Sequence, residues 1–545
     1  MLASELFFEI TLIIASFLQP KDKVQCCLVC KAWHPAFQES LFETLIIQTR
    51  ASIDKLTDPT NSAGKLLQKY GFRTQTLQII KNLRAETLTN LEITMKCCIF
   101  IEPRKTLNLI SSNLCRLKRI YFHTVDKKPF IHTFDDFEFL NDQLPELTYI
   151  SLSAQFQEMS PTELLKIERV SRSPCFKTLE SFITQTAYGW MYHLAVKYPN
   201  ISTLKTVSFS QSIIDLQSSR VLKMLATLPS TFNQLKNIAI HVENCSEHLY
   251  YDFVNQLRLF NIPIKTVEIN VLNSTKDYGP TRNVLLAAQI FANKLERIKI
   301  IHRQQSRLAF GVSYKFACHP RLVDFNIQIS KAKVILDTIL ESCPSLRIFT
   351  ITDGDLIFMS NSHIFSIKHG LRNLSLNNMS IPGRTFNQIS TCCNKLSNMQ
   401  FRCLIKLGLQ PGNDIDTYID MSSTYFTKLN INDIQFLDPV NQVKINIFIF
   451  SSSVNSTEKI WVYSNPTKVP FLRNHQQITQ RLNEKESRGI GLYVHEFPMP
   501  VRALFSREQL LEPVMQFSLN GSERELYYGY ATFKCGSIRS LVFDA

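Results

Sequence analysis

The sequence predicts an α/β solenoid, a repeat protein in which each unit adds a short strand to a growing parallel sheet. A six-residue apolar pattern recurs along most of the chain at intervals of about 24 to 32 residues. Helical patterns separate several copies, and a further helical stretch occupies the N-terminus. We therefore expect a three-helix unit at 1–47, a linker at 48–75, a repeat array at 76–435, and a β-rich C-terminal cap or degenerate repeats at 436–545.

The N-terminal stretch contains two helical patterns that meet at Pro20. The first is apolar nearly all round and must therefore be covered nearly all round. The second is expected to be capped by Asp22, and its buried positions would be Val24, Cys27, Leu28 and Val29. A third short helix is expected from near Trp33 to Phe42. Because three short helices form too small a core to cover this surface, we expect a partner to cover the rest.

This stretch resembles an F-box. The family's pattern is matched without a gap by Leu6, Glu9, Ile10, Ile14, Ser16, Phe17, Leu18, Pro20, Asp22, Leu28, Val29, Cys30, Lys31 and Trp33. Phe7 stands where the family usually has proline, a residue suited to the first helical turn. The resemblance covers only the first forty-odd residues.

The resemblance implies that these helices dock onto a Skp-family adaptor, and through it onto a cullin, in an SCF ubiquitin ligase. The residues it assigns to the adaptor contact and to the core of the F-box are Leu6, Phe7, Ile10, Ile14, Leu18, Pro20, Leu28, Val29 and Trp33.

Past this stretch the recurring pattern is an apolar residue, two variable residues, then apolar, variable, apolar. Its copies begin at Leu88, Leu117, Leu147, Leu179, Leu204, Leu235, Ile264, Leu295, Leu322, Leu346, Leu371, Leu396 and Phe426. The fourth and sixth positions point to one face of a strand. A single unit cannot bury that face alone, so neighbouring units must stack. The period and the strand together indicate a leucine-rich repeat array.

The segments between strands read as helices at 333–344 and 386–394. Each segment ends, just before a strand, in a cysteine-bearing turn that resembles those of the repeats found in F-box proteins. The resemblance implies that Cys343 and Cys392 are buried as apolar residues. The alternative interpretation of Cys392, Cys393 and Cys403 is a metal site, although their spacing does not match that of paired zinc-ligand knuckles.

Several segments depart from the repeat. We expect an edge strand at 41–47, a loop and short helix before a first strand near Leu77, and an exposed loop at 123–142. Towards the C-terminus, strand-like alternation occurs at 443–450, 459–463, 491–495 and 525–530. These strands are expected to form the cap that a solenoid needs over its last open face.

Composition indicates a folded protein, with 45% hydrophobic and 19% charged residues. The formal net charge of +14 would favour acidic surfaces, phosphorylated segments or nucleic acid. The alternative is a mildly basic surface with no charged ligand.

Nothing in the sequence reads as an export signal or a membrane span. The stretch before the apolar N-terminal helix carries Glu5 and Glu9 and no lysine or arginine, the reverse of a signal peptide. No segment approaches the roughly 20 apolar residues of a membrane span. The 14 cysteines form no compact disulfide framework and read as reduced thiols. We expect an intracellular protein, cytoplasmic or nuclear, without a membrane partner.

We expect no catalysis, no cofactor and no bound metal. The sequence has no phosphate-binding glycine loop, no nucleophile elbow and no zinc-protease helix. Only 15 glycines are present, and the 12 histidines are scattered singly.

Binding is expected instead on the polar positions that flank the fourth and sixth residues of each unit. The candidate substrate-binding residues are Arg119, Tyr121, Tyr149, Arg297, Lys299 and Arg402. The alternative is that these are merely solvated strand positions.

Taken together, the F-box-like stretch and the repeat array lead us to expect a non-catalytic substrate receptor of an SCF ubiquitin ligase, which binds a protein substrate on its repeats. One alternative is an F-box scaffold that acts outside ubiquitin transfer. The other is a repeat protein that binds RNA or another polyanion. Asp324 and Glu268 interrupt the basic residues that such a protein would use to contact a polyanion. Aromatic residues for base stacking are also sparse on the predicted strands, so we do not expect nucleic acid as the partner.

Overall fold

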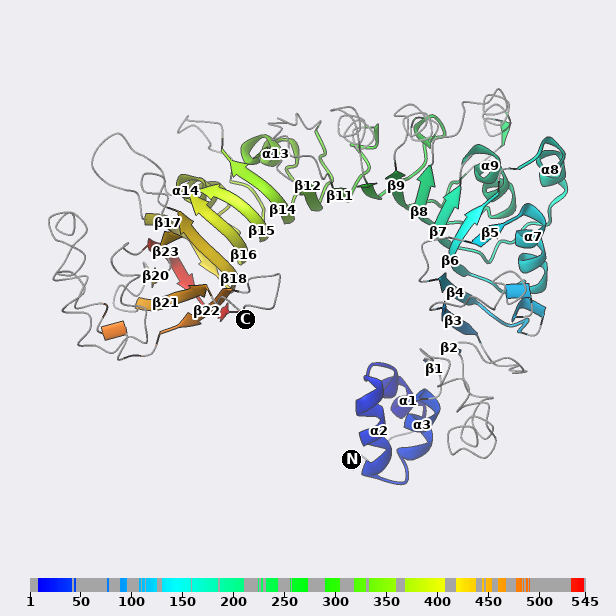
Figure 1. Cartoon of the computed structure of the whole chain (residues 1–545), viewed down its shortest axis with the longest axis horizontal. Coiled ribbons are helices and arrows are strands. Elements are labelled where there is room, and N and C mark those ends of the chain that lie inside the picture. Colours follow the sequence, from blue (N-terminus) through cyan, green and yellow to red (C-terminus); the bar gives the residue numbers. More distant parts are fainter. Residues whose placement is uncertain are drawn as a thin grey trace. The chain divides into compact units, whose positions relative to one another are not determined.

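The computed structural model divides into two compact units, Met1–Ile264 and Lys265–Ala545, which are described separately (Figure 1). The residues that it describes are 8–41, 44–45, 76–77, 89–95, 107–108, 110–112, 114–124, 130–157, 159–184, 187–209, 224, 227–228, 232–243, 255, 257–272, 290–303, 318–329, 333–358, 368–406, 418–437, 444–445, 447–452, 459–466, 477–482, 484, 487–488, 490 and 531–543.

The first unit begins with three short helices, α1 (Phe8–Ser16), α2 (Pro20–Val29) and α3 (His34–Leu41). A parallel sheet follows, in the order β1 (Thr44–Leu45), β2 (Thr76–Leu77), β3 (Asn90–Met95), β4 (Arg119–Thr124), β6 (Tyr149–Phe156), β7 (Thr178–Thr184), β8 (Thr203–Phe209) and β9 (Asn237–Glu243). The short strand β5 (Phe130–His132) pairs with the second half of β6. The helices between strands are α7 (Phe134–Gln143), α8 (Pro161–Lys166), the short 3-10 turn η3 (Ile167–Arg169) and α9 (Ala187–Lys197). Figure 1 shows α7, α8 and α9 along one side of the strands.

The second unit continues the same arrangement. Its parallel strands are β10 (Thr266–Leu272), β11 (Arg297–Arg303), β12 (Asp324–Ile329), β14 (Ile348–Ile357), β15 (Asn373–Pro382), β16 (Asn398–Lys406) and β18 (Lys428–Leu437). The helices α13 (Leu336–Ser342) and α14 (Gly383–Cys392) connect strands within it. Both units are therefore built on parallel strands with helices between them, the α/β class that the sequence predicts.

A strand lies at every copy of the predicted six-residue pattern, and in all but two copies it begins two residues after the first apolar residue. The exceptions are β7 and β8, where the predicted phase is wrong. Ile150 is the fourth residue of its copy, and strand pairing places Leu179 opposite Ile150 and Leu204 opposite Leu179. Leu179 and Leu204 are therefore fourth residues of the pattern, and Phe176 and Ile201 are the first residues of these two copies. Apolar residues three apart, at 201, 204 and 207, support two phases equally well. The backbone decides between them, because Lys177 and Thr178 both donate to the carbonyl of Thr148.

This backbone contact recurs from strand to strand. The carbonyl one residue before a strand accepts two N–H groups from the start of the next strand, as when Val323 accepts from Arg347 at 2.9 Å and from Ile348 at 3.0 Å. Arg347 then accepts from Arg372 and Asn373. The strands are thereby held so that equivalent residues of successive units lie side by side.

Alternation along each strand separates the core from the polar face. In the second unit the buried positions form ladders across the sheet, comprising Ile298 and Ile300, Phe325 and Ile327, Phe349 and Ile351, Leu374 and Leu376, Met399 and Phe401, and Leu429 and Ile431. Between them lie the half-buried or exposed residues on the opposite face. Each strand depends on its neighbours to remove these side chains from water.

The segment predicted as an exposed loop at 123–142 contains β5 and α7, so that prediction is wrong. Thr133 caps α7 through a reciprocal capping box with Asp136, and the helix buries Phe134, Phe137 and Leu140. The sequence carried both signals, a Thr-x-x-Asp start and apolar residues three apart. The helix is required because it covers the aromatic core of this unit.

That core surrounds Phe137, which is fully buried. Its ring meets those of Phe156, Trp190, His193 and Tyr198 edge-on, with centroid distances between 5.4 and 6.3 Å. Edge-to-face pairs of this kind add to the free energy that burial of the rings contributes.

A buried ionic group joins α7 to α9 beside these rings. Glu138 accepts from His193 Nε2 at 2.6 Å and from the ammonium of Lys197. Burial raises the pKa of Glu138, but the hydrogen bonds from His193 and Lys197 and the charge of Lys197 outweigh it, so that the pKa lies below its usual value of 4.5. Burial lowers the pKa of His193, which is therefore neutral near pH 7 and donates to Glu138 through Nε2.

The predicted helix at 333–344 is shorter than expected. Its first residues form β13 (Lys333–Ile335), which pairs with the end of β14, and α13 begins at Leu336. The β-branched Val334 and Ile335 favour this strand. The second predicted helix, at 386–394, is α14, which begins earlier, at Gly383.

The second unit also holds a five-stranded sheet, ordered β17 (Tyr418–Phe426), β23 (Ala531–Ile538), β20 (Ile447–Ser452), β21 (Lys459–Pro466) and β22 (Gln477–Arg481). It packs on α14 and β16 through the rings of Phe386, Phe401, Phe450 and Phe533. At Gly536 a Cβ would lie 2.7 Å from the carbonyl oxygen of Thr424, so the close approach of β23 to β17 requires glycine.

The chain returns to the parallel sheet at its C-terminal end. The short strands β19 (Lys444–Ile445) and β24 (Leu541–Phe543) both pair with β18, the latter in parallel as a further repeat strand would. The strands predicted at 443–450 and 459–463 are present, whereas those at 491–495 and 525–530 and the helix within 48–75 lie outside the described residues. Of the edge strand predicted at 41–47, the structure describes β1.

We expect Phe137→Ala to lower the free energy of unfolding of the first unit by about 3–5 kcal/mol, because it leaves a cavity among rings that cannot collapse. Phe139→Ala on the same helix is the matched control, since Phe139 is 38% exposed and should change stability by less than about 1 kcal/mol. Urea unfolding followed by tryptophan fluorescence measures both. Equal losses would contradict the assignment of this core.

We also expect the stabilising effect of Glu138 to depend on pH. Because its folded-state pKa lies below 4.5, the stability that it contributes is present above pH 4.5 and is lost as the pH falls through the folded-state value. The difference in free energy of unfolding between the wild type and Glu138→Gln should therefore be constant near pH 6 and shrink below pH 4.5. A difference that grows in acid would contradict the ionised state of Glu138.

Candidate functional site

The three N-terminal helices share a small core made largely of small side chains. Thr11 and Ala15 of α1 and Ala36 and Phe37 of α3 are buried. Trp33 is half-buried and packs against Phe37, with 5.5 Å between ring centroids. Small residues let the helices approach closely, but they leave little room for larger side chains between them.

The large apolar side chains of α1 and α2 consequently lie at the surface. Phe17 is 83% exposed and Leu28 is 76% exposed. The exposed apolar residues of this surface, called here the helical apolar surface, are Phe8, Ile10, Ile13, Ile14, Phe17, Val24, Leu28 and Val29. So many large apolar side chains exposed on and beside two short helices indicate an interaction site in a folded protein.

Four of the predicted adaptor-contact residues belong to this surface, namely Ile10, Ile14, Leu28 and Val29. Leu18 and Trp33 are half-buried, and Pro20 forms the first residue of α2. Leu6 and Phe7 lie outside the described residues. The prediction omitted Phe8, Ile13, Phe17 and Val24 from the contact, although the four-residue spacings from Ile13 to Phe17 and from Val24 to Leu28 could have identified them.

Two expectations for α2 are corrected. The N-cap is Gln19 and Pro20 starts the helix, so Asp22 lies in the first turn, where its charge favours the positive end of the helix, instead of capping it. Val24, Leu28 and Val29 were expected to be buried and are exposed, while Cys27 is half-buried. Among the described side chains of the three helices, Thr11, Ala15, Ala36 and Phe37 are the buried ones, and none of them belongs to α2.

The polar face of the first unit brings three of the predicted substrate-binding residues together. The rings of Tyr121 and Tyr149 lie 4.6 Å apart, and the Arg119 guanidinium lies 4.9 Å from the centre of the Tyr149 ring. The Tyr149 hydroxyl donates to Glu180, which also pairs with Lys205 on the next strand. Burial raises the pKa of the Tyr149 hydroxyl, and the hydrogen bond to Glu180 raises it further. Glu180 and Lys205 were not predicted, because they meet only when β7 and β8 pair.

The other three predicted residues lie in the second unit and do not form one cluster. Arg297 and Lys299 are two residues apart on β11, whereas Arg402 is exposed on β16. Lys299 pairs with Glu268 at 2.7 Å. Arg297 lies opposite Asp324 in register.

Pairing with carboxylates also limits the basic residues on and beside these strands that a polyanion could contact. Lys118 lies 3.7 Å from Glu146, and Lys205 and Lys299 each have a glutamate partner. The polar face is therefore a surface of alternating charge over these strands. The carboxylates weaken the attraction of these cations for a phosphate backbone, because fewer positive charges remain to neutralise phosphates.

The cysteine-bearing turns agree with the expected packing. Cys343, Cys392 and Cys393 are buried. Burial raises the pKa of Cys343 and of Cys393 to about 12 and also raises the pKa of Cys392. These thiols are therefore protonated and unreactive near neutral pH. Among the described residues, no group of His, Cys, Asp and Glu side chains could hold a metal ion.

Comparison of the chain with protein-family models gives no match, and comparison with curated proteins also finds none. Of the helices in the described parts of the chain, none combines the length and the apolar character that crossing a membrane requires.

Proposed function

We propose that this protein is a non-catalytic substrate receptor of an SCF ubiquitin ligase. In this proposal α1, α2 and α3 form an F-box that docks onto a Skp-family adaptor, and through it onto a cullin. The parallel strands form a leucine-rich-repeat solenoid that holds a protein substrate while other subunits transfer ubiquitin. The contribution of this chain is proximity and not chemistry.

The observation that carries the proposal is the helical apolar surface. Five of its eight residues match the F-box pattern, namely Ile10, Ile14, Phe17, Leu28 and Val29, and its most exposed side chains are Phe17 and Leu28. Burying one such side chain contributes roughly 1.5–3 kcal/mol. A handful of them therefore suffices to offset an association cost on the order of 4–15 kcal/mol.

The polar face supports the second half of the proposal. Arg119, Tyr121 and Tyr149 form a cluster of the residue types that dominate protein interfaces. Their neighbours Glu180 and Lys205 add charges of both signs. We place a protein substrate there, as its variety of charges matches this face.

We expect Leu28→Asp and Ile14→Asp to abolish co-purification with a Skp-family adaptor, because each places a charge where an apolar side chain would be buried. Leu165→Asp is the matched control, since Leu165 is 60% exposed on α8, away from the helical apolar surface. Pull-down with purified adaptor, with thermal unfolding measured in parallel, tests this.

Retention of the adaptor by both helical variants would refute the docking proposal. If the adaptor binds as expected, its depletion should slow the turnover of proteins held by the chain. Binding without any such turnover would instead favour a scaffold that acts outside ubiquitin transfer.

A further inference from the structure

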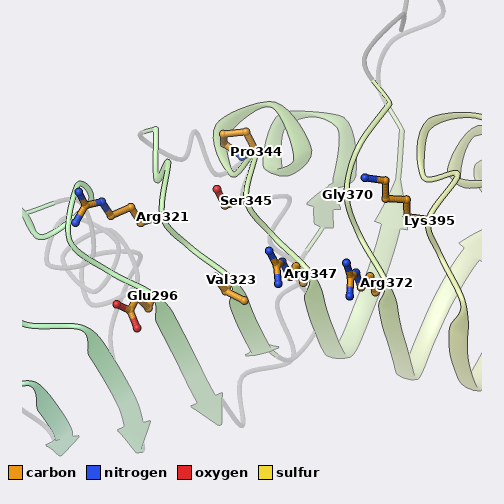
Figure 2. A pocket seen from close by; sticks show the side chains of 9 residues that line it. All are labelled: Glu296, Arg321, Val323, Pro344, Ser345, Arg347, Gly370, Arg372 and Lys395. Carbon is orange, nitrogen blue, oxygen red and sulfur yellow. The ribbon is translucent and has the colours of Figure 1, made fainter.

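A cavity of about 550 Å³ lies in the second unit, at the turns that precede its strands (Figure 2). Four of its lining residues are basic and come from four successive turns. Arg347 and Arg372 stand one residue before β14 and β15, and Arg321 and Lys395 stand three residues before β12 and β16. Figure 2 shows Arg347 and Arg372 next to each other at the starts of neighbouring strands. Each of these four successive turns therefore contributes one positive charge to the cavity.

These cations differ from those on the polar face. All four side chains are exposed, and among the described residues no carboxylate forms an ion pair with Arg347, Arg372 or Lys395. The acidic residue of the lining, Glu296, accepts from Lys265 Nζ at 2.6 Å. That hydrogen bond lowers the pKa of Glu296, and the charges of Lys265, Arg297 and Arg321 lower it further, so Glu296 offsets at most one of the four cavity cations. The cavity therefore carries an excess of positive charge.

The spacing of the cations indicates the shape of their ligand. The strands run in the order β12, β14, β15 and β16, in parallel register. Neighbouring strands lie about 4.8 Å apart, so the four basic residues extend over about 15 Å. A single phosphate or carboxylate reaches only neighbouring cations, whereas an elongated anion reaches all four. An extended peptide with acidic residues at alternate positions projects its carboxylates to one side at intervals of about 7 Å.

We propose that this cavity binds an extended acidic segment of a partner protein. Arg347 and Arg372 together hold its central carboxylate, for which the guanidinium fork is suited. Arg321 and Lys395 hold the ends. Among the described residues that line the cavity none is aromatic, so a single-stranded nucleic acid would find no stacking contacts on them.

This inference deepens the proposed function, because it gives the chemical class of a bound protein. It rests on the proposal that the strand units bind a protein, but the helical apolar surface takes no part in it. The two can therefore fail separately.

The test is fluorescence anisotropy with the full chain and a labelled peptide of alternating Asp and Ser. The matched probe carries Asn in place of Asp. We expect the Asp peptide to bind, and Arg347→Gln/Arg372→Gln to weaken that binding by about tenfold or more. The control is Arg169→Gln/Arg172→Gln, which removes the same charge from exposed positions of the first unit and should leave the affinity unchanged.

Several results would overturn the inference. The first is equal affinity for the Asp and Asn peptides. The second is an equal loss of affinity for the Asp peptide in the two double variants. The third is that an oligonucleotide of the same charge binds more tightly than the Asp peptide and loses more affinity in Arg347→Gln/Arg372→Gln. Both double variants should unfold at the wild-type temperature and retain the adaptor, because the altered side chains are exposed. Loss of peptide binding with adaptor binding intact therefore concerns this cavity alone.

Discussion

In-register pairing of parallel strands is the constraint on which the rest of the structure depends. Each strand places its apolar side chains in ladders with those of its neighbours, and the carbonyl before it receives two N–H groups from the next strand. Because equivalent residues lie side by side, any residue type that recurs at one position becomes a row. The ladder of Phe325 and Phe349, the cluster around Tyr149 and the basic row of Arg347 and Arg372 are all consequences of this one register.

The N-terminal helices present the opposite case. The strands bury the apolar side chains of one another, whereas the described side chains buried among α1, α2 and α3 are Thr11, Ala15, Ala36 and Phe37. Large apolar side chains of these helices, such as Ile13 and Leu28, stay in water. Such an arrangement is costly unless another protein covers it. The proposed adaptor contact would cover these side chains, and the substrate site proposed on the polar strand face uses other residues.

The strands could be predicted because burial of two residues per strand leaves a local pattern in the sequence. The phase at β7 and β8 could not, because Ile201 and Leu204 are both apolar and only pairing distinguishes them. The helix at Phe134–Gln143 was missed although its capping box was visible, since its charged residues resembled a loop. The exposure of Phe17 and Leu28 depends on which small residues meet between helices, and the pairing of Glu180 with Lys205 depends on two strands. Both are properties of the folded chain and not of any local pattern.

The most direct test of the central claim, that a partner covers the helical apolar surface, is hydrogen exchange of the full chain with and without a Skp-family adaptor. We predict slower amide exchange at α1 and α2 in the presence of the adaptor, because covering their apolar side chains suppresses local opening. Exchange on β14 and β15 should stay the same. A complex that forms without any change at α1 and α2 would contradict the account.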